Sequence, residues 1–252
     1  MTEMNEQSEL PYYYKYKRMM VAIDVVIFTI LDSKLKVLLV KRSNITAHPK
    51  ETDKKDHYAL LGGIVRFEET FEEAVNRVLQ LKAHIQVETQ EIYVEQLYTF
   101  DAIARDPRDR VLSVSYYTLV KPDKITLIEE DKLEWVDAYN LPEKLVIDHG
   151  LILETAIKRL IGKIEYNTIP FSLLDDKFTF AQLQNIYEAL LNKPLEKRNF
   201  RKKFVDRKEP LIVPTGEYIK IENEARRPVQ LYKLAQPVGT ILKRSLFDEK
   251  GN

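Results

Sequence analysis

The segment 60–84 constrains the fold of this chain more than any other stretch. A strand-like run ends in the pair Gly62-Gly63, where the backbone can adopt conformations closed to other residues. Thr70 and Glu73 have the spacing of a capping box, which predicts that a helix begins there. Apolar side chains that recur at helical spacing would face a core: Phe71, Ala74, Val75, Val78 and Leu79. The segment therefore predicts a strand, a glycine turn, a loop and an amphipathic helix.

The same segment resembles the Nudix box, which reads G-x5-E-x7-R-E-U-x-E-E-x-G-U, where U is a bulky apolar residue. Five positions of the chain match this signature: Gly63, Glu69, Arg77, Leu79 and Ile85. Four positions differ from the Glu or Gly of the signature: Val78, Leu81, Lys82 and His84. The resemblance implies a Nudix-like fold.

The departures from the box decide the expected chemistry. In Nudix hydrolases the helix carboxylates hold Mg²⁺ or Mn²⁺, and these cations need oxygen ligands. Val78 and Leu81 supply no oxygen, and Lys82 puts a positive charge where the metal would be. Glu72 and Glu73 are expected to favour the helix N-terminus through its dipole. We therefore expect no catalytic residue, metal or cofactor; the alternative is an active Nudix hydrolase of nucleoside diphosphate derivatives with an accessory domain.

The composition excludes several classes of protein. The 252 residues are 44% hydrophobic and 31% charged, which suits one large or two modest globular domains. The formal net charge is +0, so binding of nucleic acid would need a local basic patch. Cysteine is absent, which rules out disulfides and fits a cytoplasmic location. No apolar run has the length of a membrane span, and the first residues do not resemble a signal peptide.

The order of expected elements indicates an α+β fold with two domains. Residues 1–18 are expected to be a flexible arm, or an arm that contacts phosphate or a sister subunit. A Nudix-like α/β/α sandwich covers residues 19–162 and a linker covers residues 163–170. The strands and the second helix of the sandwich are expected at 21–30, 35–41, 92–100, 111–120, 133–136 and 148–161. Residues 171–235 form the second domain, and residues 236–252 form a tail.

The second domain has the element order of a winged helix-turn-helix. A helix that begins at Thr179 is followed by a basic helix, which Phe200 and Phe204 would anchor inward. A hairpin after the basic helix would form the wing. The candidate DNA-binding residues are Lys197, Arg198, Asn199, Arg201, Lys202, Lys203, Arg226 and Arg227. The cations can bind phosphates, and Asn199 can read base edges. Two alternatives for the basic helix remain: a solvated charged face, or a binding site for an acidic partner.

Together the two domains resemble the NrtR family of Nudix-related transcriptional regulators. The resemblance rests on the altered box and on the segments 178–184, 194–203 and 226–233, and it extends over roughly residues 20–235. It implies a bacterial repressor that binds a palindromic operator in double-stranded DNA as a homodimer. It also implies that the Nudix domain senses a small metabolite. That effector would be an ADP-ribose-like nucleotide of NAD metabolism or a sugar such as arabinose.

The effector site is expected around the charged turn 105–110. Arginines there could form a fork onto a diphosphate, or the turn could be a surface loop of ion pairs that contribute little. Residues at the strand end, the glycine loop and the box could line the same cleft. The candidate effector-binding residues are Arg42, Arg66, Glu69, Arg105 and Arg108. Arg77 is expected to brace the loop through a carboxylate such as Glu69.

Overall fold

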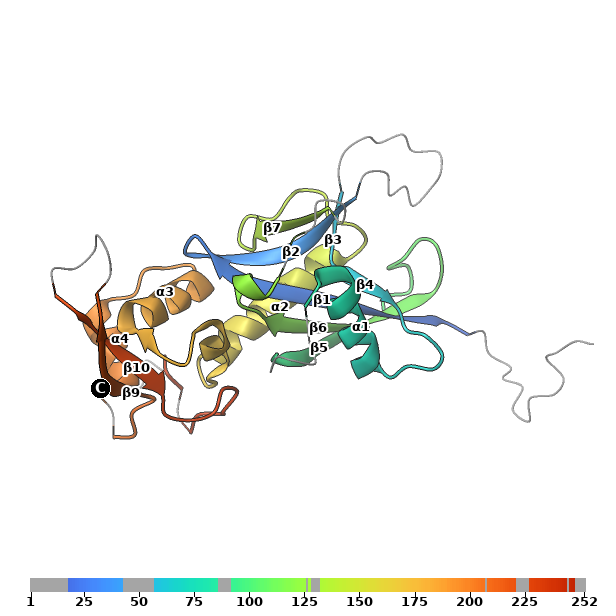
Figure 1. Ribbon diagram of the computed structural model, residues 1–252. Helices are drawn as coiled ribbons and strands as arrows, with labels where there is room; N and C mark the ends of the chain where they lie inside the picture. Colours follow the sequence, from blue (N-terminus) through green and yellow to red (C-terminus); the bar gives the residue numbers. More distant parts are fainter. Residues whose placement is uncertain are drawn as a thin grey trace, which may run out of the picture.

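The computed structural model shows two domains that lie side by side and are connected through a long helix, α2 (Figure 1). The described residues are 18–42, 57–85, 92–125, 127, 132–206, 208–220, 227–243 and 245–247. Nearly all of the expected arm, residues 1–17, and the candidate residue Arg226 lie outside them. In the part of the chain that is described, no helix is long and apolar enough to cross a membrane.

The first domain is built on a seven-stranded sheet with the order β3-β2-β1-β6-β5, in which β4 also pairs with β1 and β7 with β2. The strands are β1 (Met20–Leu31), β2 (Lys34–Arg42), β3 (His57–Ala59), β4 (Leu61–Ile64), β5 (Val94–Phe100), β6 (Val111–Leu119) and β7 (Leu133–Asp137). β1 and β6 run parallel, and the other described pairs are antiparallel. This topology places β1 at the centre of the sheet.

The expected hairpin at the start of the domain is present. Leu31 of β1 pairs with Lys34 of β2, so the turn contains only Asp32 and Ser33. Their φ angles are 52° and 58°, which is the left-handed backbone that a tight two-residue hairpin needs to match the twist of its strands. The turn therefore fixes the register of the two strands.

Helices cover both faces of the sheet, which makes the domain an α/β/α sandwich (Figure 1). Side chains alternate between the two faces along β1. Ile23 and Val25 pack with the apolar face of α1 (Phe71–Ala83). Val26 and Phe28 pack in the opposite cluster, which contains the buried residues of α2 (His149–Ile164). The sandwich and its expected helix over the altered box are confirmed.

The segment 163–170, predicted as a linker, is packed and partly helical. α2 continues past Gly162 to Ile164, and a 3-10 turn, η5 (Ile169–Leu173), follows shortly after. Ile164 and Ile169 are fully buried in the core cluster that reaches into the second domain. A helix-interior glycine costs only about 1 kcal/mol relative to alanine, so tertiary packing carries the helix through Gly162.

The second domain is a winged helix-turn-helix, as predicted. It consists of β8 (Phe178–Thr179), α3 (Phe180–Leu191), α4 (Lys197–Phe204), β9 (Ile212–Ile219) and β10 (Val229–Leu234). The sheet has the order β8-β10-β9. Thr179 forms a capping box with Gln182 that begins α3, and Asn192 in a left-handed conformation ends it. Phe200 and Phe204 of α4 are buried against Tyr187, which confirms their expected anchoring role.

The two domains share one continuous apolar cluster. Polar contacts also cross the boundary: the Tyr139 hydroxyl donates to the Leu190 carbonyl of α3, and Lys121 after β6 pairs with Asp175 at 2.6 Å. A 3-10 turn, η3 (Pro122–Lys124), lies beside the second of these contacts. The second domain therefore has a defined orientation on the sandwich.

The described part of the segment predicted as a tail is docked against the end of α2. The Leu242 N–H donates to the Tyr166 carbonyl at 2.7 Å, and the Leu246 N–H donates to the Glu165 carbonyl at 2.6 Å. Leu242 and Leu246 are buried in the shared cluster. The prediction failed because a few apolar residues in an irregular stretch have no periodicity that indicates burial.

Candidate functional site

A cavity of about 270 Å³ opens beside the glycine turn of the sandwich. Its walls come from β1, β4, the last turn of α1, the charged turn before β6 and the start of α2. The lining residues are Ala22, Asp24, Arg42, Leu60, Gly62, Gly63, Ile64, Lys82, Arg105, Asp106, Pro107, Arg108, Val111, Val146, Ile147 and His149. Four of these side chains are cationic and two are carboxylates, not counting histidine, so the cavity favours an anion.

Close packing of the glycine turn against β1 forms the floor of the cavity. A Cβ atom on Gly62 would lie 2.3 Å from both the Asp24 Oδ1 atom and the Ile23 carbonyl oxygen, so only glycine fits there. The Gly62 carbonyl accepts a hydrogen bond from the Lys82 ammonium. The last turn of α1 therefore reaches the floor through a lysine.

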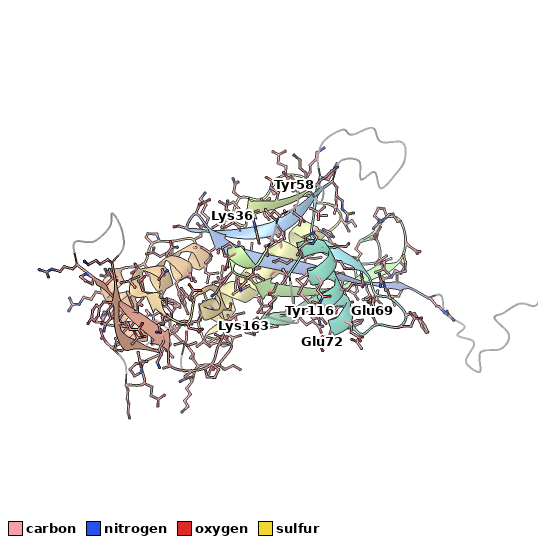
Figure 2. The ribbon with its side chains drawn as sticks, in the orientation of Figure 1. Lys36, Tyr58, Glu69, Glu72, Tyr116 and Lys163 are labelled. Atoms are coloured by element: carbon pink, nitrogen blue, oxygen red, sulfur yellow. The ribbon has the colours of Figure 1, made fainter. Side chains whose placement is uncertain are left out.

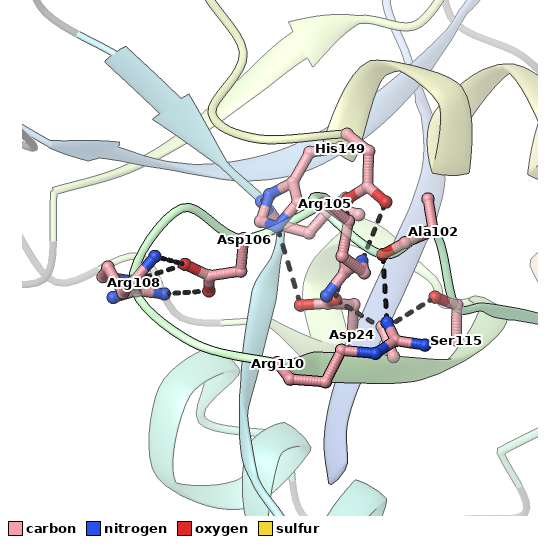
Figure 3. Close-up of polar contacts among 11 residues, drawn as sticks. Asp24, Ala102, Arg105, Asp106, Arg108, Arg110, Ser115 and His149 are labelled. Atoms are coloured by element: carbon pink, nitrogen blue, oxygen red, sulfur yellow. Dashed lines mark hydrogen bonds and ion pairs between the residues drawn. The ribbon is translucent and has the colours of Figure 1, made fainter. Parts of the chain in front are cut away.

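Arg105 lies in a buried network of charges rather than at an open rim (Figure 3). Its guanidinium donates to Asp148 through Nε at 2.8 Å and Nη2 at 2.6 Å, and Nη2 lies 3.7 Å from the Asp24 carboxylate. The Arg105 side chain is only 3% exposed. The structure thus corrects the expectation of a free arginine fork at this residue, because Asp148 already occupies the fork.

His149 completes the network at the start of α2. Its Nδ1 atom accepts a hydrogen bond from the Leu60 N–H at 2.9 Å, and its Nε2 atom lies 3.8 Å from the Asp24 carboxylate (Figure 3). Burial lowers the pKa of His149, which favours the neutral ring. Asp24 also accepts a hydrogen bond from the Ser113 hydroxyl at 2.6 Å. These contacts fix the start of α2 against the sheet.

Arg108 is exposed at the edge of the cavity, and Asp106 holds it in place. The guanidinium donates to the Asp106 carboxylate through Nε at 2.9 Å and Nη2 at 2.6 Å. The hydrogen bond with Arg108 lowers the pKa of Asp106, and the same contact raises the pKa of Arg108. Because Nε and Nη2 of the Arg108 guanidinium already donate to Asp106, only its remaining N–H groups can donate to a ligand.

Arg66 and Glu69 are not among the residues that line the cavity. Glu69 accepts hydrogen bonds from Arg77 at 2.8 and 2.5 Å and from the Arg66 N–H at 2.7 Å. The hydrogen bond from Arg77 lowers the pKa of Glu69 to about 2. The predicted bracing of the loop by Arg77 is confirmed, and it occupies the carboxylate that was a candidate for effector binding.

Glu72 and Glu73 of the box lie in the first turn of α1. Glu73 accepts from the Thr70 N–H at 2.7 Å in the expected capping box. Glu72 lies beside Tyr116 (Figure 2), whose pKa is raised by burial and by that carboxylate. Among the described residues, no group of three or more His, Asp or Glu side chains is arranged to hold a metal ion.

The cavity contains residues that sequence reasoning did not assign to it. Asp24, Lys82 and His149 line it together with the predicted Arg42, Arg105 and Arg108. Asp24 was recognisable as the only charged residue in a strand whose other residues are apolar except for Thr29. His149 gave no comparable signal, because its partners lie far away in the sequence.

The basic helix α4 exposes part of the predicted DNA-binding set. Phe200 and Phe204 point into the core, which leaves one face of the helix in contact with solvent. The exposed residues on this face are Lys197, Arg198, Asn199 and Lys202. Glu196 caps the helix by accepting from the N–H groups of Arg198 and Asn199 at 2.9 and 2.7 Å. Arg227, before β10, is exposed as well.

Arg201 and Lys203 make contacts within the protein instead. The Arg201 guanidinium lies 5.6 Å from the centre of the Phe180 ring and donates to the Tyr232 hydroxyl at 3.1 Å. The Lys203 ammonium donates to the Leu246 carbonyl at 2.5 Å and lies 4.9 Å from the centre of the Phe247 ring. These contacts occupy donors of both side chains, so their assignment to the DNA-binding set stays a prediction.

Two family models match the chain. The NUDIX domain matches residues 20–156, and the NrtR DNA-binding winged helix domain matches residues 170–234. The chain is 33% identical over 238 residues to the ADPR-responsive transcriptional repressor of Acinetobacter baylyi, with 92% of this chain and 89% of that protein covered. It is 30% identical over 150 residues to the ADP-ribose pyrophosphatase of Methanocaldococcus jannaschii, with 59% of this chain and 79% of that protein covered.

The solved structures agree with this assignment. NrtR of Shewanella oneidensis in complex with a 27mer DNA superposes with a TM-score of 0.67 and 29% identity, and the match covers 89% of this chain and 98% of that one. The match includes both domains in the same order. This chain therefore belongs to the NrtR family, in which a Nudix domain is joined to a winged-helix DNA-binding domain.

Proposed function

We propose that this protein is a transcriptional repressor that binds operator DNA as a homodimer, and that an ADP-ribose-like nucleotide in the cavity controls its affinity for the operator. The main support is that one chain joins a cationic cavity to a winged-helix domain with an exposed basic helix. The A. baylyi relative is an ADPR-responsive repressor, and the S. oneidensis relative was solved with DNA.

The charges of the cavity favour a nucleotide diphosphate over a neutral sugar as the effector. Arg105 and Arg108 are each paired with an aspartate. For Arg42 and Lys82, no carboxylate lies within ion-pairing distance among the described residues. Within the described part of the chain these two cations have no ion-pair partner, and their charge matches that of a diphosphate, whereas a pentose would leave them unneutralised.

DNA binding is assigned to the exposed face of α4. Lys197, Arg198 and Lys202 are suited to phosphates, and Asn199 has the donor and acceptor needed to read an adenine edge. A homodimer would place two such helices about 34 Å apart, which is one turn of the DNA helix. The palindromic operator expected for the family would then match the twofold symmetry of the protein.

The Nudix domain is proposed to bind without hydrolysis. Val78 is buried and Leu81 is exposed on α1, and neither offers an oxygen to a metal. Glu69 and Glu73 are already engaged by Arg77 and Thr70. The M. jannaschii relative is an ADP-ribose pyrophosphatase, so hydrolysis of ADP-ribose is the specific alternative.

The test uses the purified full-length protein and a duplex selected from random DNA. Fluorescence anisotropy would measure its affinity for this duplex with and without ADP-ribose, and with arabinose as a control. We expect ADP-ribose to change the affinity by about fivefold or more, and arabinose to leave it unchanged. A parallel incubation with ADP-ribose and Mg²⁺ should release no AMP. Turnover near one per second would instead establish a hydrolase, and an unchanged affinity would refute the proposed effector.

A further inference from the structure

The divalent cation of Nudix hydrolases does not fit this cavity. Such a cation needs several oxygen ligands, and α1 presents Val78, Leu81 and Lys82 at the corresponding positions of the box. The described residues contain no cluster of acidic side chains or histidines that could replace those ligands. The cavity must therefore neutralise an anion in another way.

Lys82 has the position that such a role requires. Its ammonium donates to the Gly62 carbonyl on the cavity floor, and it lies 3.9 Å from where a Cβ atom on Gly63 would be. The lysine reaches back from the last turn of α1, so the helix and the glycine turn together fix its position. Burial, and then the charges of Arg42 and Arg77, lower the pKa of Lys82, and the Asp24 carboxylate opposes them in part. An anion would relieve this repulsion between neighbouring cations.

The other two cations of the cavity are already paired with aspartates, so Lys82 and Arg42 are the cations that can bind an anion there. Asp148 holds Arg105 at 2.6 Å, and Asp106 holds Arg108 at the same distance. Asp24, the remaining carboxylate, is engaged by the Ser113 hydroxyl at 2.6 Å and lies 3.7 Å from Arg105. Lys82 and Arg42 line the same cavity, so an anion between them would have two cationic partners.

We propose that the Lys82 ammonium takes the place of the divalent cation and, together with Arg42, binds the diphosphate directly, so that effector binding needs no metal. This inference rests on the proposed function for the identity of the effector, but the anion site itself does not depend on it. The ammonium contributes one fixed charge and up to three donors, one of which is used by Gly62. It cannot activate water as a metal ion does, so the site would retain its ligand intact.

The test measures binding of inorganic pyrophosphate and of ADP-ribose to the full chain by isothermal titration calorimetry, with either EDTA or Mg²⁺ present. For the native protein we expect equal affinity for ADP-ribose in the two conditions and binding of pyrophosphate in EDTA. Lys82→Met should weaken both ligands about tenfold or more, since a hydrogen bond to a charged group is lost. Lys82→Arg should retain most of the affinity.

The matched control is Lys158→Met, which removes an exposed lysine of α2 that does not line the cavity. It should bind both ligands like the native protein, and thermal unfolding would confirm that each variant is folded. If pyrophosphate binds through Lys82 and ADP-ribose does not bind, the anion site stands and the proposed effector fails. The inference is overturned if native binding requires Mg²⁺, if Lys82→Met binds like the native protein, or if pyrophosphate does not bind.

Discussion

Glu69 stabilises the loop before α1, and its charge makes that contribution depend on pH. Its pKa of about 2 lies below the ordinary carboxyl value of 4.5, chiefly because of the hydrogen bond from Arg77. A depressed folded-state pKa gives stability that is complete above the unfolded-state pKa and is lost as the pH falls through the folded-state pKa. The contribution should therefore be present at neutral pH and disappear in strong acid.

We predict that Glu69→Gln is less stable than the native protein at about pH 7, and that this difference shrinks between about pH 4.5 and pH 2. Urea unfolding followed across this range would measure it. Glu154→Gln is the control, because its pair with Lys158 is exposed on α2 and should contribute little. A stability difference for Glu69→Gln that stays constant down to pH 2 would contradict the assignment.

At this scale, the sequence predicted local contacts and missed distant ones. In the Thr70–Glu73 capping box and in the Arg77–Glu69 ion pair, the two partners are at most eight positions apart in the sequence. Their spacing was therefore enough to predict both contacts. The pairing of Arg105 with Asp148 spans 43 positions, so no local pattern indicates it. A variant that removes Arg105 would take the ion-pair partner from the partly buried Asp148 and a neighbouring cation from the buried Asp24, and would lower stability by about 3–5 kcal/mol. Arg105 is therefore a poor probe of effector binding.

The helices and strands whose apolar residues recur at regular spacing were predicted well. The apolar faces of α1 and α3 and the hairpin of β1 and β2 all follow from regular spacing. The end of α2 and the docked segment after residue 235 were missed, because tertiary packing decides both. The contacts of Arg201 and Lys203 in α4 were missed for the same reason: their partners are Tyr232 and Leu246, outside this helix.

Some cations of α4 are exposed to solvent and others contact the rest of the protein. The neighbouring residues Lys202 and Lys203 can test this difference. We predict that Lys202→Ala weakens binding to all DNA sequences and lowers the slope of log affinity against log salt by roughly 0.9, as expected for one lost phosphate contact. Lys203→Ala should leave that slope unchanged and lower the stability of the protein, since its ammonium binds the docked C-terminal segment. Anisotropy titrations over a range of salt would separate them. An equal loss of slope in both variants would show that Lys203 also contacts DNA.

At the scale of the whole molecule, α2 connects the cavity to the DNA-binding domain. Its 16 residues span about 24 Å. Asp148 and His149 at its start bind cavity residues, and the Glu165 carbonyl at its end accepts from Leu246. A ligand that changes the contacts of Arg105 or His149 would therefore act on an element that is packed against both domains. The sequence predicted both domains but not this connection, because it placed a linker there.

This arrangement predicts reciprocal coupling between the two ligands. If ADP-ribose changes the affinity for operator DNA, operator DNA must change the affinity for ADP-ribose by the same factor, about 5- to 150-fold. Titrating ADP-ribose with and without saturating operator measures that factor directly. Tyr139→Phe removes the hydroxyl that bonds to Leu190 across the domain boundary, so it should alter the coupling while each ligand alone binds nearly as before. Equal ADP-ribose affinity in the two titrations would mean that the sites are independent, even if the protein binds both ligands tightly.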